Sequence, residues 1–166
     1  SIPYTFSTHA IAWSVYDSDF AREFFAEMAD SVGLDVIGVG ENGGFRNFTS
    51  NGRLIRSPED MKGLKIRPQE HAGKMAMVRA LGAAATPIAY SELYTALQTG
   101  VVDGQENAIP TIYQVNLQEV QDYLTLDNHI YGSYYTVVNS RWLASLPEEF
   151  QHVVRDAGRQ AAVASR

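Results

Sequence analysis

The sequence predicts an α/β fold with a largely parallel sheet. Short β-rich runs alternate with amphipathic helical runs along the chain, which is typical of strand–helix–strand units. The connections between these runs are brief and rich in glycine, proline or asparagine, and no internal repeat or low-complexity linker interrupts them. A chain of 166 residues is long enough for one domain with its own core or for two small lobes.

Helix caps and glycine stops define the predicted elements of the first half. Ser57 is a favoured helix cap, Pro58 fits the first helical position, and Gly63 follows as the stop. The predicted elements are a helix over 17–31 capped by Asp17 or Ser18, a strand over 34–38, a turn at 42–44, a strand over 45–49, a short helix from 58 and a strand over 64–67.

The second half contains the most informative run, residues 91–107. Ser91 is expected to cap a helix that stops at Gly100, and a short strand then leads into the polar residues 103–107. Polar groups at the end of a strand lie where α/β folds bind ligands. The other predicted elements are a helix over 71–81, an extended segment over 83–89, a helix over 111–120, strands over 123–126 and 134–138, and a final helix that buries Phe150, Val153, Val154, Ala157 and Ala161. That helix carries no stop signal, which suggests that the chain is part of a larger protein.

Composition excludes several classes of function. The 13 basic and 19 acidic residues give a net charge of −6, and no Lys/Arg run is present, so nucleic acid and anionic membranes are not expected partners. The absence of cysteine excludes disulfides, thiolate metal sites and a cysteine nucleophile. The longest mostly apolar stretch, residues 72–89, carries charges, so no membrane insertion is expected. The N-terminus lacks the apolar core of a signal peptide. A signal peptide was therefore either never made or has been removed.

No pattern in the sequence favours catalysis. Residues 38–43 match a dinucleotide fingerprint by letters, but strand-like residues follow them instead of a helix, so we expect neither a nicotinamide nor a flavin cofactor. The four histidines are scattered and form no metal-binding motif. His129 is expected to be a hydrogen-bonded structural residue. The alternative is an α/β enzyme in which Arg67 anchors a carboxylate substrate and His129 acts as the base.

Two arginines are the strongest candidates for ligand binding. Arg46 and Arg67 lie in or just after predicted strands among apolar residues, where a charge is unfavourable unless it is paired. Each could pair with a structural carboxylate or reach solvent, or its guanidinium could bind a ligand carboxylate. Asn107 could be a turn residue or bind a ligand through its amide. Tyr90 could line a pocket or pack in the core.

Several phrases resemble the solute-binding proteins of tripartite ATP-independent periplasmic (TRAP) transporters, of the type that binds four-carbon dicarboxylates. The resemblance covers residues 44–149 and is looser over 1–43. The matching phrases are Gly-Phe-Arg at 44–46, Ser-Pro-Glu-Asp-Met-Lys-Gly-Leu-Lys-Ile-Arg at 57–67, the run at 91–107, Glu-Val-Gln at 119–121, Asn-His at 128–129 and Leu-Pro-Glu-Glu at 146–149.

The resemblance implies a fold, a function and a set of site residues. It implies a periplasmic-binding-protein-like fold of two lobes joined by hinge strands, incomplete in this chain, with residues 1–45 in the first lobe and first hinge, 46–130 in the second lobe, and 131–166 in the hinge return and C-terminal helix. It also implies a periplasmic protein that is not an enzyme and that delivers a small organic acid to TRAP membrane subunits. Ligand contacts are implied for Arg67, Arg46, Asn107 and Tyr90.

Two positions depart from the family pattern. Pro68 directly follows Arg67, whereas relatives place another residue before the proline, and Ala108 stands where proline is common. Both changes could reshape the wall of the pocket and alter which acid it fits.

Overall fold

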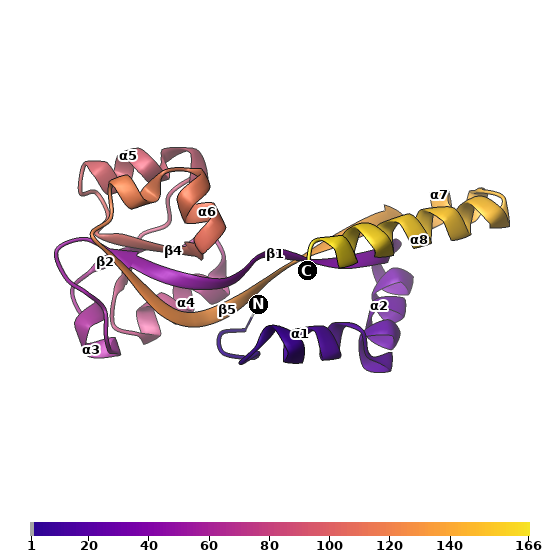
Figure 1. The fold of residues 1–166 in the computed structure, drawn as a ribbon, viewed down its shortest axis with the longest axis horizontal. Coiled ribbons are helices and arrows are strands. Elements are labelled where there is room, and N and C mark those ends of the chain that lie inside the picture. Colours follow the sequence, from indigo (N-terminus) through magenta and orange to yellow (C-terminus); the bar gives the residue numbers. More distant parts are fainter. Residues whose placement is uncertain (1) are drawn as a thin grey trace. The chain divides into compact units, whose positions relative to one another are not determined.

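The computed structural model describes residues 2–166, which divide into two compact units. The central unit comprises residues 2–5 and Phe45–Tyr131, and the flanking unit comprises Phe6–Gly44 and Gly132–Arg166. Two long strands, β1 (Leu34–Ser50) and β5 (Tyr123–Asn139), each contribute residues to both units (Figure 1). The lobe and hinge roles given to these segments above stay predictions.

The central unit is built on a mixed sheet in the order β3-β2-β4-β1-β5. Strand β2 (Lys65–Arg67) pairs in parallel with β3 (Ala84–Ala85) and with β4 (Gly104–Ala108). Strand β4 pairs antiparallel with β1, so the α/β prediction is confirmed but the sheet is not largely parallel. The polar run predicted to follow a strand is itself β4, in the middle of the sheet.

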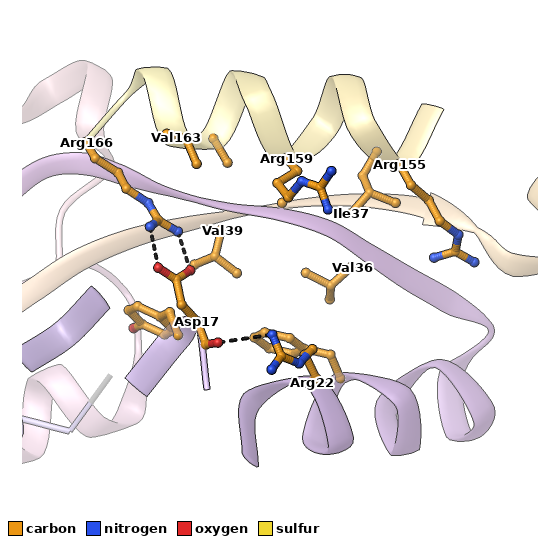
Figure 2. Close-up of a pocket in the computed structure, with 13 residues that line it drawn as sticks. Asp17, Arg22, Val36, Ile37, Val39, Arg155, Arg159, Val163 and Arg166 are labelled. Carbon is orange, nitrogen blue, oxygen red and sulfur yellow. Dashed lines mark hydrogen bonds and ion pairs between the residues drawn. The ribbon is translucent and has the colours of Figure 1, made fainter. Parts of the chain in front are cut away.

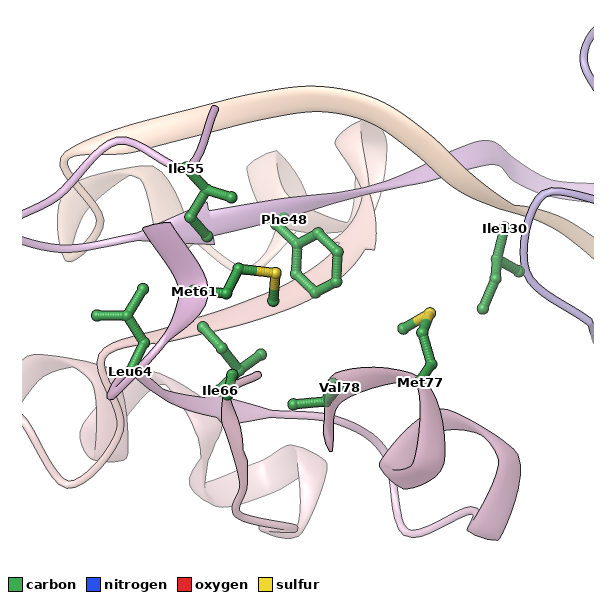
Figure 3. Close-up of a cluster of buried hydrophobic side chains, with 9 residues drawn as sticks. Phe48, Ile55, Met61, Leu64, Ile66, Met77, Val78 and Ile130 are labelled. Carbon is green, nitrogen blue, oxygen red and sulfur yellow. The ribbon is translucent and has the colours of Figure 1, made fainter. Parts of the chain in front are cut away.

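Helices cover both faces of this sheet (Figure 1). On one side lie α3 (Pro58–Met61) and α4 (Ala72–Ala80), and on the other lie α5 (Leu93–Gln98) and α6 (Ile109–Gln114). Phe48 of β1, Ile66 of β2 and Val78 of α4 meet in one apolar core (Figure 3). A second core gathers side chains of α5, α6 and the short helix η2 (Leu117–Glu119); its buried members are Leu93, Ala96, Leu97, Val102, Ile112 and Leu117. Burial of these side chains supplies the main driving force for folding.

The flanking unit combines the outer parts of β1 and β5 with four helices. These are α1 (His9–Tyr16), α2 (Asp19–Val32), α7 (Ser140–Ser145) and α8 (Glu148–Ala164). The predicted buried face of α8 is wrong, because Phe150 and Val153 are exposed whereas Gly158 and Ala162 are buried. Gly158 allows α8 to approach β1 closely: a Cβ on it would lie 2.7 Å from Cδ1 of Ile37. Close backbone packing, and not the spacing of apolar residues along the helix, therefore sets the orientation of α8.

Several of the caps and stops predicted from the sequence are confirmed. Ser18 caps α2, whose end is Gly33 in the left-handed conformation, and Ser57 forms a capping box with Asp60 at the start of α3. The predicted cap at Ser91 is wrong, because a 3-10 turn, η1 (Tyr90–Glu92), precedes α5. The helix predicted over 111–120 is split into α6 and η2 by Asn116, which has a φ of 56°.

The strand boundaries differ most from prediction. The two strands predicted over 34–38 and 45–49 form one strand, β1, and those predicted over 123–126 and 134–138 form β5. Gly43 and Gly44 adopt positive φ values of 73° and 76° inside β1, so this glycine pair is absorbed within the strand instead of ending it. The segment predicted to be extended over 83–89 contributes only β3 to the sheet.

Candidate ligand-binding site

The middle strand of the central unit carries polar side chains that are almost completely buried. Gln105, Glu106 and Asn107 are at most 3% exposed. Buried polar groups are tolerated when they are hydrogen-bonded, and here the amides form a chain. Asn107 Nδ2 donates to Gln105 Oε1 (2.9 Å), and Gln105 Nε2 donates to Thr49 Oγ1 (2.9 Å). Thr49 Oγ1 then donates to Gln121 Oε1 (2.7 Å). This chain holds the Asn107 side chain in a fixed orientation.

Glu106 is the centre of a buried charged cluster. Arg46 Nε bonds to Glu106 Oε2, and Arg46 Nη2 donates to Glu106 Oε1 (3.0 Å) and to its backbone oxygen (2.7 Å). Lys74 Nζ lies 3.5 Å from Glu106 Oε1. Burial alone would raise the pKa of Glu106, but hydrogen bonds from His129 and Arg46 and the charges of Arg46 and Lys74 lower it to about 2. Glu106 is therefore a carboxylate at neutral pH, and Arg46 is held by it.

His129 is a structural member of the same cluster. Its side chain is fully buried and stacks on Phe48, with 4.3 Å between the ring centroids. Its Nδ1 lies 2.8 Å from Asp127 Oδ2 and its Nε2 lies 3.3 Å from Glu106 Oε2. Burial opposes protonation, but the hydrogen bonds to Asp127 and Glu106 outweigh it and raise the pKa of His129. Because both ring nitrogens are engaged and none is exposed, His129 is not placed to act as a base on a substrate.

Arg67 is held differently from Arg46. It ends β2 and is 2% exposed. Its Nε and Nη2 both donate to the backbone oxygen of Ile88, at 2.8 and 2.7 Å. Its Nη1 is buried without a hydrogen-bond partner, and among the side-chain atoms that the structure describes only one other buried polar atom is in this state. Burial lowers the pKa of Arg67, whereas the charge of Glu106 acts in the opposite direction. The guanidinium is thus fixed on one side and unsatisfied on the other.

The predicted site residues come from neighbouring strands and one short helix of the central unit. Arg67 and Gln105 are register partners on β2 and β4, and Arg46 of β1 faces Ala108 of β4. The ends of β2 and β4 therefore bring Arg67, Asn107 and Arg46 to one edge of the sheet. Tyr90 begins η1 and is 48% exposed, so it is not a core residue. Tyr90 lies two residues after Ile88, whose backbone oxygen accepts from Arg67, which places it near this edge.

Sequence reasoning missed Lys74. Its side chain is 12% exposed, and its Nζ also donates to Gln69 Oε1 (2.6 Å). The available signal was its position in the first turn of the helix that follows β2, because that turn lies at the same edge as the end of the strand. Glu106 was predicted only as part of the polar run 103–107, whereas the structure pairs it with Arg46.

A cavity lies elsewhere, in the flanking unit. It has a volume of about 600 Å³ and is lined by residues of α1, α2, β1 and α8 together with Asp17 and Arg166, and four of the lining residues are arginines (Figure 2). Each of these arginines contacts a carboxylate: Arg22 pairs with Asp19, Arg155 with Asp35, Arg159 with Asp156, and Arg166 with Asp17. An arginine whose charge is already neutralised has little to offer a ligand carboxylate, so we place the candidate site at Arg67 despite the size of this cavity.

Neither a metal site nor a membrane span is found in residues 2–166. These residues contain no group of three or more metal-binding side chains that could hold an ion. None of the helices formed by the described residues is long and apolar enough to cross a bilayer.

Comparison with known proteins decides the family. A model of the family "Bacterial extracellular solute-binding protein, family 7" matches residues 1–166. The chain belongs to this family. It is a family of binding proteins and not of enzymes, so the alternative with a catalytic His129 is wrong.

Relatives and solved structures agree with this assignment. A solute-binding protein of Verminephrobacter eiseniae is 36% identical over 99% of this chain and 49% of its own length. The 2,3-diketo-L-gulonate-binding periplasmic protein YiaO of Escherichia coli is 31% identical over 96% of this chain and 48% of its own length. A TRAP periplasmic solute-binding protein of Polaromonas sp. JS666, bound to D-erythronate, aligns with a TM-score of 0.89 and 36% identity over 99% of this chain and 54% of that one. The chain thus spans about half the length of the relatives it matches.

Proposed function

We propose that this chain is the ligand-binding part of an extracytoplasmic subunit that captures a small organic acid and delivers it to a TRAP membrane transporter. In this proposal Arg67 binds the ligand carboxylate, Asn107 hydrogen-bonds to the same acid group, Arg46 supports the site through Glu106, and Tyr90 lines the pocket. The relatives named above bind 2,3-diketo-L-gulonate and D-erythronate, which are both carboxylic acids. Specificity for four-carbon dicarboxylates stays a prediction.

The unpaired Nη1 of Arg67 is the observation that supports this proposal most directly. A buried guanidinium without a counter-charge is unfavourable, since a buried charge needs both a partner and hydrogen bonds. Ile88 satisfies two of the donors and supplies no negative charge. A carboxylate that approaches from the other side would accept hydrogen bonds from Nη1 and neutralise the charge. In this proposal the arginine is preorganised to bind an anion.

The arginine contact alone does not account for capture at low concentration. Charge-assisted hydrogen bonds contribute about 1.5–3 kcal/mol each, whereas a micromolar dissociation constant corresponds to roughly 8 kcal/mol. The remainder must come from pocket walls such as Tyr90 and from closure of the two lobes around the ligand. Each lobe would then bury part of the acid, and delivery would follow reopening at the transporter.

Arg67→Ala in the intact protein tests this function. We expect calorimetric titration with a panel of sugar acids, keto acids and dicarboxylates to find a ligand for the unchanged protein and at least a 100-fold weaker interaction for the variant. Arg79→Ala is the matched control, because Arg79 is an exposed arginine on α4. Retained affinity in Arg67→Ala would contradict the proposal.

A further inference from the structure

Three side chains that the proposed carboxylate clamp does not use form a hydrogen-bonded relay that ends at Asn107. The relay passes from Gln121, which precedes β5, to Thr49 of β1 and then to Gln105 of β4. Thr49 and Gln105 are at most 2% exposed. Their hydrogen bonds must therefore be satisfied within the protein, and a change at one member of the relay affects the next.

The direction of the relay is fixed at the end farthest along it from Asn107. Gln121 Nε2 donates to the backbone oxygen of Val120 (2.9 Å), and a carbonyl oxygen can only accept. Gln121 therefore presents Oε1 to Thr49, whose hydroxyl donates its one hydrogen to it (2.7 Å). Thr49 Oγ1 is left to accept from Gln105 Nε2, so Gln105 Oε1 accepts from Asn107 Nδ2. Each bond determines the next one.

The orientation of the Asn107 amide decides which atoms it can offer to a ligand. An amide has two N–H donors and one acceptor oxygen. Gln105 accepts from one N–H of Asn107, and no other side-chain hydrogen bond to this amide is found within residues 2–166. An amide turned the other way would point its oxygen at Gln105 Oε1, and two acceptor oxygens repel each other. The relay thus allows one orientation, in which the second N–H of Nδ2 is held for an acceptor on the ligand.

We propose that Gln105, Thr49 and Gln121 are positioning residues that preorganise Asn107 for the ligand, so that ligand affinity depends on a hydroxyl group that acts only through Asn107. The inference rests on the proposed function, which gives Asn107 its contact with the acid group. A side chain that is fixed before binding loses little conformational entropy when the ligand arrives, and this raises the affinity.

Replacement of Thr49 in the intact protein tests the relay. Thr49→Val keeps the shape of the side chain and removes the hydroxyl, whereas Thr49→Ser keeps the hydroxyl. Calorimetric titrations use D-erythronate, 2,3-diketo-L-gulonate and succinate. We expect the acid that binds to be held about 10-fold more weakly by Thr49→Val and to be affected less than about 3-fold by Thr49→Ser.

A second variant breaks the relay at its more accessible end, where the risk to folding is lower. Gln121 is only partly buried, and Gln121→Ala removes the group that orients the Thr49 hydroxyl. We expect binding about 3-fold weaker than in the unchanged protein. Gln118→Ala, at an exposed glutamine nearby in the sequence, is the matched control and should leave the affinity unchanged.

A double-variant cycle separates positioning from a general structural role. If Thr49 acts through Asn107, then Thr49→Val should change the affinity less than about 2-fold in a protein that already carries Asn107→Ala. A structural threonine would weaken binding by the same factor in both backgrounds, and that result overturns the inference.

The ligand-free protein provides a readout that does not depend on affinity. NMR relaxation of the Asn107 side-chain amide should give an order parameter of about 0.85 in the unchanged protein and in Thr49→Ser, and below about 0.6 in Thr49→Val. An equally rigid amide in Thr49→Val overturns the inference, even if Asn107→Ala abolishes binding and leaves the cycle without a value.

The results also distinguish this inference from the proposed function. Loss of binding in Arg67→Ala together with unchanged affinity in Thr49→Val overturns the relay and leaves the carboxylate clamp intact. If neither these three acids nor the wider panel binds the unchanged protein, the proposed function is contradicted and the inference falls with it.

Discussion

The two units of the chain use charged side chains in opposite ways. In the flanking unit, arginines line a cavity and pair with aspartates, and some of these ion pairs, such as Arg159–Asp156, are exposed. In the central unit, arginines lie inside the sheet, where Arg46 pairs with a buried glutamate and Arg67 has no carboxylate partner. A charge at the surface is solvated by water and its ion pairs contribute little to stability, so an exposed arginine is weak evidence for a binding site. Charge inside a sheet is unfavourable unless something binds it, and it therefore marks the site better than cavity size does.

Removal of the central counter-charge gives the largest expected effect. Glu106→Gln leaves Arg46 and Lys74 buried without the carboxylate that they share, and breaking a buried pair in this way costs about 3–5 kcal/mol. We expect urea denaturation to show a loss of this size. Glu70→Gln, at an exposed position, is the control and should change the unfolding free energy by less than about 0.5 kcal/mol. A small effect of Glu106→Gln would show that the central cluster behaves like the surface pairs of the flanking unit.

The pH dependence of stability sharpens the same comparison. The pKa of His129 is raised above its ordinary value of 6.5 in the folded protein by Asp127 of β5 and Glu106 of β4. Its contribution to stability is therefore complete below pH 6.5 and is lost as the pH rises through the folded-state pKa. We expect the stability of the unchanged protein to fall over this interval, and His129→Gln to remove that part of the slope.

Urea denaturation of both proteins at a series of pH values between 5 and 9 measures this difference. His152 provides the matched control, since it is an exposed histidine of α8 in the flanking unit, and His152→Gln should leave the slope unchanged. An identical slope in His129→Gln and the unchanged protein would mean that His129 is neutral in the fold.

The sequence predicted the α/β class and the position of most helices because those features depend on local signals. Ser18, Ser57 and Gly33 act within one helical turn, so their effect is legible from neighbouring residues. That residues 104–108 form a strand could not be predicted from their neighbours in the sequence. Gln, Glu and Asn are poor strand formers, and the hydrogen-bond partners Thr49 of Gln105 and Arg46 of Glu106 come from distant parts of the chain.

The same difference between local signals and long-range contacts explains which site residues could be predicted from the sequence. Arg67 could be selected from the sequence because an arginine among strand residues already conflicts with local preference. Lys74 of α4 meets the Glu106 carboxylate of β4, which Arg46 of β1 and His129 of β5 also contact, and only the assembled fold brings these side chains together. A residue that acts by sharing a counter-charge with residues distant in the sequence cannot be predicted before the fold is known.

The smallest expected effect is at the surface pairs of the flanking unit. Arg159 and Asp156 lie three residues apart on α8, with side chains 70% and 55% exposed and 2.7 Å between Nη2 and Oδ1. Solvent screens such a pair, and ordering two long side chains opposes it, so the interaction is worth about 0.2–1 kcal/mol. Arg159→Ala, Asp156→Ala and the double variant form a cycle in which urea denaturation should give a coupling energy within this range. A coupling above about 2 kcal/mol would place the cavity arginines in the same class as Arg46, and the preference for the central unit as the binding site would then lose its electrostatic basis.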